Sequence, residues 1–496
     1  MVSSTSSEWD VRDLPLYIDG HFDRAASGED FALVDPATGR DFGRAAQAGP
    51  DDVDRAVAAA RTALDGPWGR MPAPGRQALL HAIAAGIEAH AERFVEAEVR
   101  DTGRPLTMAR GFDVPRAAAT FREFASLSAG LAGESFTTQA PDGTRAISYA
   151  LRVPLGVVGL ICPWNLPLVL LTWKLAPALA MGNTVVVKPS EHSPSTATLL
   201  AEIMAEAGVP PGVFNVVHGY GPGGAGEAIV RHPGVAAISF TGETATGRAI
   251  MADAAPGLKK LSLELGGKNA AVIFADADLG QAVPACARSV FLHAGQLCLC
   301  NERIFVERPI YAQVVERLAA AASGLVVGDP RAPRTRMGPL TNAEQRDKVR
   351  SYYDRARNDG ATILAGGGVP SLPAPFAGGF FVQPTVWADL PASSSLWTEE
   401  VFGPCCAVAP FDTEDEVVAR VNETDYGLAA SLWTGDGGRA TRMAARLDVG
   451  VVWINCWLVR DLRTPFGGSK HSGIGREGGV HSFAAFSQLR NVTVAS

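Results

Sequence analysis

The fold is decided by a strand–helix–strand pattern at residues 156–188, which read GVVGLICPWNLPLVLLTWKLAPALAMGNTVVVK. Short apolar runs at 157–161 and 184–188 flank an apolar helical stretch at 168–180. The same alternation of helices and short apolar strands continues to residue 240. Strands of this kind form parallel sheets that helices cover on both faces. The sequence therefore predicts an α/β fold with a doubly wound, Rossmann-type sheet.

The segments on either side extend this pattern. The spacing of apolar residues predicts helices at 51–64, 75–99 and 115–131. A hairpin is expected at 136–153, and a second α/β series follows residue 260. The chain ends with an apolar run at 490–494. Such a strand lies at a sheet edge or pairs with another chain, so we expect an oligomer.

The composition is that of a folded, weakly acidic chain. Its 496 residues predict two large domains or three smaller ones, and a hydrophobic content of 47% excludes disorder as the main state. Lys and Arg number 44 against 52 Asp and Glu, which gives a net charge of −8. The sequence has no clustered basic surface for phosphates, so we expect no nucleic-acid partner. An anionic substrate would need local arginines in this overall field.

Cysteine usage and the apolar stretches bear on the compartment. Seven cysteines form an odd, sparse set, which favours reduced thiols in a cytoplasm over a disulfide framework. The N-terminal residues show no basic region followed by an apolar run, so no secretory signal is expected. The uncharged stretch 153–173 is as long as a membrane span, but three prolines, two glycines and Asn165 interrupt it. A buried strand, a loop and a buried helix fit it better.

Several strand ends carry residues suited to a nucleotide. GPGGAG at 221–226 fits the GxGxxG pattern, although a tight strand-to-helix turn explains it equally well. Lys188 and Glu191 follow one strand, and Thr241 with Gly242 follows another. Doubly wound sheets bind dinucleotides where such strand ends face helix N-termini. A carboxylate such as Glu191 can accept ribose hydroxyls and disfavours a 2′-phosphate.

Two residues suit nucleophilic and general-base catalysis. Glu264 ends the strand in LELGGK, and Cys298 follows the glycine-containing turn in GQLC. A reactive thiol needs an exposed or electropositive position, and a carboxylate can act as general base for water. Taken singly, a buried structural cysteine and a solvated glutamate explain these residues as well. We expect no metal, because the sequence has no C-x₂-C pair, HExxH motif or histidine cluster.

Taken together, the motifs resemble those of the aldehyde dehydrogenase superfamily over essentially the whole chain. The motifs occur in the family's order: PWNLP at 163–167, VVVKPSE at 185–191, FTGE at 240–243, LELGGK at 263–268, GQLC at 295–298, EEVFGP at 399–404 and PFGGSKHSGIGREGG at 465–479. The resemblance implies three units: a Rossmann-type NAD-binding domain at 1–131 and 152–262, an α/β catalytic domain at 263–460, and a small β oligomerisation element at 132–151 and 482–496.

The resemblance also implies the chemistry. Cys298 matches the nucleophile, which adds to the aldehyde to give a thiohemiacetal. Asn165 and the backbone N–H of Cys298 match the oxyanion hole. Hydride transfer to the nicotinamide leaves a thioester, and Glu264 matches the base that activates water for its hydrolysis. Cys300 matches no catalytic role.

The implied cofactor is NAD. Lys188 and Glu191 match contacts to the adenosine ribose, Glu400 matches a contact to the nicotinamide ribose, and Phe402 matches a packing surface for the nicotinamide end. The remaining residues expected in the cofactor site are Pro163, Trp164, Ser190, Gly221, Gly226, Thr241, Gly242, Glu243 and Leu265.

Glu243 departs from the usual superfamily pattern, in which a small hydroxyl residue follows FTG. A carboxylate beside a pyrophosphate is unfavourable unless it points away. FTGE is, however, similar to a narrower branch of the superfamily that oxidises muconic semialdehydes. The stretches DVPRAAATFREFA at 113–125 and VRDLRTPFGGSK at 459–470 also resemble that branch.

Arg116 and Arg460 match the arginines that would hold the carboxylate of such a substrate, for which guanidinium is the natural bidentate partner. Arg460 follows a run that looks buried, so it needs either a ligand or a protein carboxylate near Asp461. Trp173 and Trp457 are expected to line the substrate tunnel, although core packing explains either of them.

We therefore expect a cytoplasmic, NAD-dependent dehydrogenase that oxidises an anionic semialdehyde and forms a homodimer or homotetramer without nucleic-acid or membrane partners. The leading substrate is 2-aminomuconate 6-semialdehyde, and 2-hydroxymuconate semialdehyde is the next. Three alternatives stay open: the same chemistry on neutral or cationic aldehydes, a structural or binding protein without turnover, and a cofactor-independent thiol hydrolase.

Overall fold

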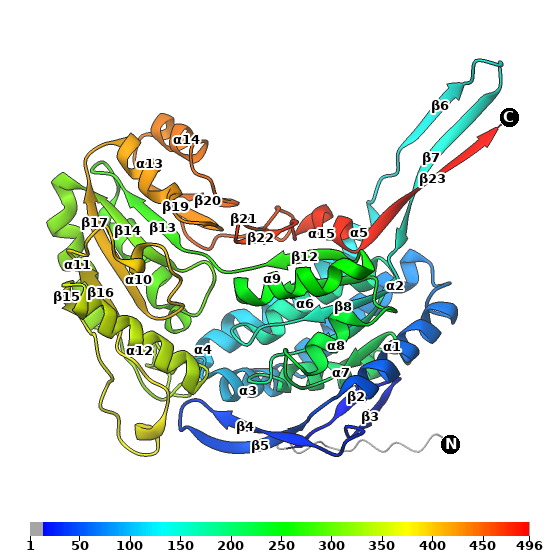
Figure 1. Ribbon diagram of the computed structural model, residues 1–496, viewed down its shortest axis with the longest axis horizontal. Coiled ribbons are helices and arrows are strands. Elements are labelled where there is room, and N and C mark those ends of the chain that lie inside the picture. The colour runs from blue at the N-terminus through cyan, green and yellow to red at the C-terminus, as the bar shows by residue number, and fades with distance from the viewer. Residues whose placement is uncertain (1–12, 496) are drawn as a thin grey trace.

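Two mixed sheets dominate the computed structural model, which describes residues 13–495 (Figure 1). The first sheet has the strand order β22-β12-β11-β8-β9-β10-β2-β3. Its strands are β2 (Leu16–Ile18), β3 (His21–Asp23), β8 (Val157–Ile161), β9 (Thr184–Lys188), β10 (Phe214–Val216), β11 (Ala237–Thr241), β12 (Lys260–Glu264) and β22 (Gly473–Ile474). The five central strands, β8 to β12, run parallel, which confirms the predicted doubly wound sheet.

Helices cover both faces of the first sheet because alternate strand residues are apolar on each side. Val158 and Leu160 of β8 pack with one set of helices: α2 (Ala73–Ala89), α3 (Ala91–Thr102), α5 (Val114–Ala129), α6 (Pro167–Ala180) and α7 (Ser195–Glu206). Val157 and Ile161 pack with the other set: α1 (Pro50–Asp65), α8 (Ala225–Arg231) and α9 (Thr244–Ala254). Fully apolar strands are therefore buried on both sides.

The order of the strands reverses between β8 and β11. From β8 the chain passes to β9 and β10 on one side, and it then crosses to β11 and β12 on the other. Open α/β sheets bind ligands at the carboxyl ends of the strands beside such a reversal. The loops 162–166 and 242–243, which follow β8 and β11, lie at this position.

The second sheet has the order β15-β16-β17-β14-β13-β19-β20. Its strands are β13 (Asn269–Ile273), β14 (Asn301–Glu307), β15 (Thr362–Ala365), β16 (Thr385–Ala388), β17 (Cys405–Phe411), β19 (Ala429–Trp433) and β20 (Val451–Ile454). All pairs except β15 with β16 are parallel. The helices of this part are α10 (Leu279–Phe291), α11 (Tyr311–Ser323), α12 (Ala343–Asn358), α13 (Glu414–Asn422) and α14 (Gly437–Ala444).

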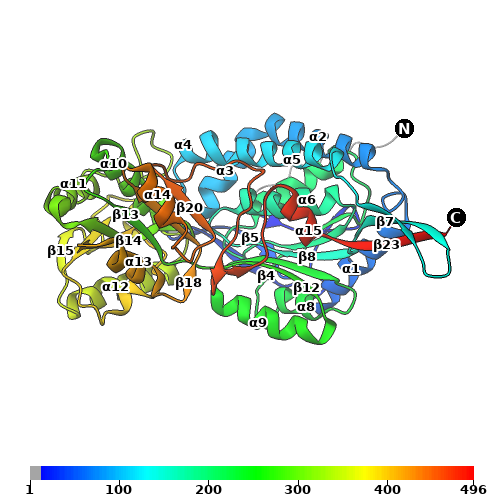
Figure 2. The same cartoon turned by 90° about the horizontal axis from the view of Figure 1, so that it is seen from above.

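A three-stranded antiparallel arm projects from the body of the molecule in both views (Figures 1 and 2). It contains the predicted hairpin, as β6 (Ser135–Gln139) and β7 (Arg145–Pro154), and the C-terminal strand β23 (Ser487–Ala495). β23 pairs with β7 and forms one edge of this sheet, so the prediction of an edge strand is confirmed.

One expectation for local structure was wrong, and one group of strands was not anticipated. The segment 75–99 forms two helices instead of one, because the backbone leaves the helical path at His90 between α2 and α3. The N-terminal residues 13–46 form short strands, including β1 (Asp13–Leu14), β4 (Asp30–Asp35) and β5 (Arg40–Ala46), where no strand was expected. These strands are short and partly exposed, so their apolar alternation is weak.

The apolar stretch 153–173 contains the end of β7, the strand β8, a loop and the start of α6, as expected. Among residues 13–495, no helix is long and apolar enough to cross a membrane.

Candidate active site

Cys298 lies in the turn between α10 and β14, directly before the second sheet. The turn begins with left-handed residues, including His293 and Ala294 at φ 53° and Gly295 at φ 71°. Asn269 at the start of β13 donates a hydrogen bond from its Nδ2 to the Cys298 carbonyl at 2.6 Å. The thiol is half-buried, and burial, with the charge of Glu264 adding, raises the pKa of Cys298 to about 12. The thiol is therefore neutral at rest and needs activation.

Glu264 comes from the end of β12 in the first sheet, so the two sheets meet around the thiol. Its side chain is buried, and neither carboxylate oxygen has a hydrogen-bond partner among the described residues. Burial, followed by the charge of Glu477, raises the pKa of Glu264 well above its usual range. A buried carboxyl without a partner and with a raised pKa is suited to accept a proton from water.

Asn165 lies in the loop after β8 and is buried. Its Nδ2 donates to the carbonyl of Gln296 at 2.8 Å, so the amide lies against the turn that carries Cys298. Its own backbone carbonyl accepts a hydrogen bond from Arg104 Nη1 at 3.2 Å. Asn165 can therefore offer an N–H near the thiol, as an oxyanion hole requires.

A buried ion pair beside Glu264 was missed in the sequence. Lys174 of α6 and Glu477 form a contact of 2.8 Å, and Ser239 Oγ also donates to Glu477 at 3.3 Å. The charge of Lys174 opposes the rise in the pKa of Glu264. One signal was available, because Lys174 is the single charged residue of an otherwise apolar helix. Buried lysines almost always have a partner.

Lys188 and Glu191 lie together at the carboxyl end of β9. Lys188 Nζ donates to the carbonyls of Pro189 (2.8 Å) and Gly219 (2.7 Å) and lies 3.3 Å from Glu191. Burial acts to raise the pKa of Glu191, but the charge and hydrogen bond of Lys188, a backbone hydrogen bond and the charge of His192 together outweigh it, and the pKa is lowered. Glu191 is therefore an ionised acceptor, which fits ribose hydroxyls and repels a 2′-phosphate. The neighbouring Ser190 is buried and accepts a hydrogen bond from the next turn.

The glycine-rich segment 221–226 forms a turn before α8 whose amide at Gly223 already bonds the Glu227 carboxylate at 2.8 Å. A Cβ on Gly226 would lie 2.9 Å from the Cα of Gly221 and 3.3 Å from the Lys188 side chain. Close packing beside Lys188 thus accounts for Gly226, whereas a Cβ on Gly221 would meet nothing within 4 Å. The tight-turn interpretation of GPGGAG is the one this geometry favours.

The end of β11 offers a different kind of position. Thr241 is buried, and its hydroxyl has no partner among the described residues. Gly242 bonds the Glu264 carbonyl, and the next residue, Glu243, is exposed, so its carboxylate is free to point away from the sheet. Leu265 is buried against Gly247 of α9. A buried, unsatisfied hydroxyl at the strand reversal fits a polar ligand such as a dinucleotide.

Glu400 and Phe402 lie on the loop that precedes β17. Glu400 accepts a hydrogen bond from the Gly267 amide at 2.8 Å, and a Cβ on Gly266 would lie 2.3 Å from its other oxygen. Burial, with the charge of Glu302 adding, raises the pKa of Glu400 to about 8. The Phe402 ring meets Trp164 edge-on at 5.4 Å. Pro163 and Trp164 are half-buried beside this loop. The carboxylate of Glu400 and the rings of Phe402 and Trp164, together with the hydroxyl of Thr241, suit the ribose and nicotinamide parts of NAD.

Arg116 on α5 and Arg460 are near neighbours, since each lies within reach of the other's charge. Within residues 13–495, neither guanidinium has a hydrogen-bond or ion-pair partner. Arg460 lies over the rings of Phe466 (3.9 Å) and Trp173 (4.9 Å). Burial lowers the pKa of Arg460 to about 10 and also lowers that of Arg116. The charge of Asp461 acts on Arg116, and the charges of Glu264 and Glu477 act on Arg460, but none of these carboxylates forms an ion pair with either guanidinium within residues 13–495. Two partly buried cations without a directly paired anion are an unfavourable arrangement unless a ligand supplies the charge.

The two tryptophans differ in their surroundings. The Trp173 ring contacts Arg460, and its indole N–H is buried without a partner among the described residues. Trp457 instead donates its N–H to the Leu299 carbonyl at 3.1 Å, directly beside Cys298. Trp457 therefore supports the turn of the nucleophile, whereas Trp173 accompanies the arginines. Across residues 13–495, no cluster of His, Cys, Asp and Glu has the arrangement of a metal site.

Comparisons with known proteins agree with this arrangement. The model of the aldehyde dehydrogenase family matches residues 22–492, and the chain belongs to that family. It is thus an oxidoreductase that acts on aldehydes, and enzymes of this kind use NAD(P).

Two curated relatives and one solved structure are especially similar. The chain is 53% identical to the 2-hydroxymuconic semialdehyde dehydrogenase of Pseudomonas sp. (strain CF600), over 98% of this chain and 100% of that protein. It is 52% identical to the 2-aminomuconic 6-semialdehyde dehydrogenase of Pseudomonas sp., over 96% and 97%. The NAD⁺ complex of an aldehyde dehydrogenase from Bacillus cereus superposes with a TM-score of 0.95 at 36% identity, over 100% and 99%.

Proposed function

We propose that this chain oxidises the aldehyde group of an anionic muconic semialdehyde, with NAD as the hydride acceptor. The observation that carries the proposal is that neither guanidinium, of Arg116 or of Arg460, has a hydrogen-bond or ion-pair partner within residues 13–495, and that Arg460 lies close enough to Cys298 for their charges to interact. A carboxylate at the far end of a conjugated semialdehyde would satisfy both cations with charge-assisted hydrogen bonds. Neutral and cationic aldehydes would leave them unpaired.

Two named relatives support a substrate with this chemistry, one for 2-hydroxymuconic and one for 2-aminomuconic semialdehyde. We infer that 2-aminomuconate 6-semialdehyde is the leading substrate and 2-hydroxymuconate semialdehyde the second candidate. The two molecules differ in one hydrogen-bonding group and share the carboxylate and the aldehyde, so both fit the arginine pair.

In the proposed mechanism, the Cys298 thiol releases its proton to solvent water as Sγ adds to the aldehyde carbon and forms a thiohemiacetal oxyanion. Asn165 Nδ2 and the backbone N–H of Cys298 donate to the oxyanion. Bound NAD supplies the acceptor for the hydride, and loss of that hydride leaves a thioester on Cys298. Glu264 takes a proton from water, which attacks the thioester, releases the carboxylic acid and frees the thiol.

For the cofactor, we propose that Lys188, Glu191 and Ser190 bind the adenosine ribose and that Glu400 binds the nicotinamide ribose. Thr241, whose buried hydroxyl has no hydrogen-bond partner within residues 13–495, would face the middle of the NAD molecule at the strand reversal. The ionised Glu191 favours NAD over NADP. The other cofactor-binding residues expected from the sequence belong to the same proposed site: Pro163, Trp164, Gly221, Gly226, Gly242, Glu243, Leu265 and Phe402.

We also propose a homo-oligomer of two or four copies in the cytoplasm. Ile147, Tyr149 and Leu151 of β7 share one face of the arm with Val492 and Val494 of β23, because Ile147 pairs with Val494 and Tyr149 with Val492, and Leu151 is the next residue of β7 on that face. Three of these five side chains are more than 40% exposed, which suits coverage by a second copy. Seven free cysteines fit a reducing compartment. The domain limits expected from the sequence are retained as part of this proposal.

The test is the charge profile of the wild-type enzyme. NADH formation is measured with 2-hydroxymuconate semialdehyde, with a neutral aldehyde of similar length and with a cationic aldehyde. The proposal predicts a kcat/KM for the semialdehyde at least about tenfold above that for the neutral aldehyde, as expected from one additional charge-assisted contact. A preference for neutral or cationic aldehydes would leave the family assignment intact and reject this substrate class.

A further inference from the structure

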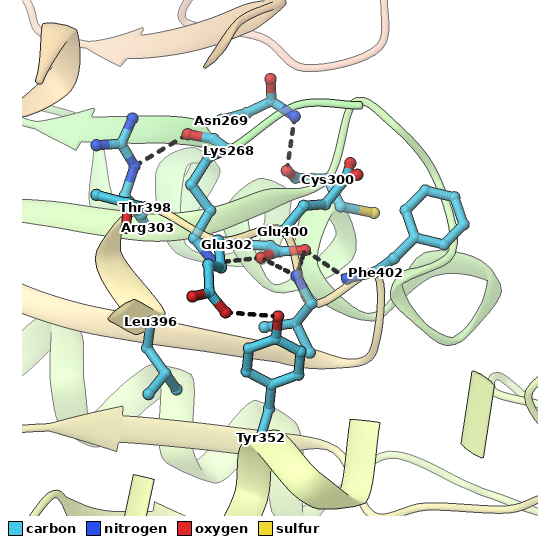
Figure 3. Close-up of polar contacts among 12 residues, drawn as sticks. Lys268, Asn269, Cys300, Glu302, Arg303, Tyr352, Leu396, Thr398, Glu400 and Phe402 are labelled. Atoms are coloured by element: carbon cyan, nitrogen blue, oxygen red, sulfur yellow. Dashed lines mark hydrogen bonds and ion pairs between the residues drawn. The ribbon is translucent and has the colours of Figure 1, made fainter. Parts of the chain in front are cut away.

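A buried carboxylate that has no place in the proposed mechanism contacts the loop at 399–404, which carries Glu400 and Phe402 and is called the cofactor loop below. Glu302 is on β14, four residues after Cys298, and its side chain is only 5% exposed. It forms a buried ion pair with Lys268, which follows the two glycines after Glu264. Figure 3 shows Glu302 at the centre of a network that joins β14, and Lys268 directly before β13, to the loop at 399–404.

The contacts of Glu302 are directed at that loop. Its carboxylate accepts hydrogen bonds from the backbone amides of Val401 at 3.0 Å and Phe402 at 2.8 Å. These amides directly follow Glu400, so their anchoring fixes where the Glu400 carboxylate and the Phe402 ring lie (Figure 3). Gln345 of α12 holds the other side of the peptide by donating to the Phe402 carbonyl at 2.8 Å.

The loop needs such anchoring because its backbone is strained. Phe402 has φ 57°, a left-handed conformation that costs a residue with a side chain on the order of 1 kcal/mol or more. The loop also touches the turn of the nucleophile, since a Cβ on Gly295 would lie 2.0 Å from the Gly403 carbonyl. A shift of the loop would therefore move Glu400 and Phe402 together relative to Cys298.

We propose that Glu302, neutralised by Lys268, is a positioning residue that holds Glu400 and Phe402 in place for the nicotinamide half of the cofactor. Glu302 does not touch the reacting atoms. It links the strand after Cys298 and the turn after Glu264 to the cofactor loop, and so fixes the distances between these three segments. The inference rests on the cofactor site of the proposed function but not on the identity of the aldehyde.

The experiment measures NAD binding without any aldehyde, by quenching of tryptophan fluorescence, in Glu302→Gln and in the double variant Lys268→Met with Glu302→Gln. The double variant removes both buried charges together, so it avoids the unpaired lysine that could prevent the single variant from folding. Glu307→Gln on the same strand is the matched control, because Glu307 bonds the Ala275 amide and not the cofactor loop. Hydrolysis of p-nitrophenyl acetate without cofactor reports on Cys298 in every variant.

The inference predicts that the Kd for NAD rises about tenfold in both Glu302 variants, as expected for a displaced binding group, while the esterase rate and the control stay within about twofold of wild type. An unchanged Kd in the folded double variant would overturn it. Parallel losses of NAD binding and esterase rate would also overturn it, because they would show a general collapse of the site. Failure of the semialdehyde assignment would alter neither readout.

Discussion

At the scale of single residues, the proposed chemistry depends on a thiol and a carboxyl that are both held out of their ordinary ionisation ranges. Burial raises the pKa of Cys298 to about 12 and that of Glu264 well above its usual range. Glu264 also lacks any hydrogen-bond partner within residues 13–495. Since none of these residues hydrogen-bonds the Glu264 carboxyl, a water molecule can do so. This suits Glu264 to the hydrolysis of the thioester rather than to the addition of the thiol to the aldehyde.

Glu264→Gln should therefore separate the two halves of the reaction. We expect the first-turnover burst of NADH to remain, while steady-state turnover falls by about 10²-fold or more, because general-base catalysis typically contributes that much. In the wild type the base acts when deprotonated, so kcat should rise with pH as Glu264 titrates through its raised pKa. Stopped-flow absorbance of NADH measures both. The assignment of Glu264 as the base would be contradicted if the variant lost the burst, or if its kcat still rose with pH as in the wild type.

At the scale of structural elements, the turn that carries Cys298 is shaped by its contact with the cofactor loop. Gly295 has φ 71°, and an added Cβ would lie 2.0 Å from the Gly403 carbonyl, which is backbone and cannot rotate away. The two segments therefore approach more closely than any other residue type permits at that position.

Gly295→Ala should destabilise the protein by more than about 2 kcal/mol, from the positive φ and the clash together, and abolish NAD-linked activity. Gly143→Ala is the matched control, because Gly143 also has a positive φ (91°) but an added Cβ meets nothing within 4 Å. It should lose about 1 kcal/mol and keep its activity. Chemical denaturation measures both variants, and equal losses would show that the contact with Gly403 contributes nothing.

The buried end of α3 should make stability depend on pH. Glu98 accepts a hydrogen bond from the Leu168 amide at the start of α6 (2.9 Å), and burial, with the charge of Asp113 adding, raises the pKa of Glu98 to about 8. Between pH 4.5, the ordinary pKa of a glutamate, and about pH 8, Glu98 therefore keeps its proton in the folded protein but loses it in the unfolded chain. The free energy of unfolding therefore falls as pH rises between these values and levels above about 8.

Glu98→Gln removes this proton linkage while keeping an acceptor for the Leu168 amide. Thermal denaturation at a series of pH values should show that the Tm of the variant gains on that of the wild type as pH rises from about 5 to about 8. A constant Tm difference across that range would mean that Glu98 ionises in the folded protein as it does in the unfolded chain.

The elements were predictable where apolar periodicity is strong and local. The central strands β8, β9 and β11 and the helix α6 follow from runs of apolar residues that are buried on both faces. The break at His90 and the N-terminal strands were missed, because tertiary packing decides them and not local periodicity. The candidate site residues were found through motifs. The buried roles of Glu302 and Glu477 were missed, because their ion pairs with Lys268 and Lys174 join segments that are far apart in the sequence.

At the scale of the whole molecule, the two sheets bring Glu264 and Cys298 together, and the arm carries an apolar face away from the body (Figure 1). Ile147 and Val494 pair in the ladder of β7 and β23, and both are more than half exposed. An exposed apolar face on a projecting arm is typical of an interface between subunits.

Ile147→Glu combined with Val494→Glu should convert the oligomer to a monomer, because two charges would have to be buried in the interface. Sedimentation velocity measures the change in mass. Thr138→Glu is the control, since Thr138 is exposed and pairs with Ala146 on the opposite face of the arm, and it should leave the assembly intact. If the double variant kept the wild-type mass, the subunits would have to meet through another surface.

The most direct test of the central claim compares Arg116→Met and Arg460→Met with the wild type on two substrates, 2-hydroxymuconate semialdehyde and a neutral aldehyde of similar length. If the arginine pair binds the distant carboxylate, each variant should raise the KM for the semialdehyde about tenfold and leave kcat/KM for the neutral aldehyde within about twofold. Equal losses on both substrates, or no loss on the semialdehyde, would contradict the assignment of an anionic substrate.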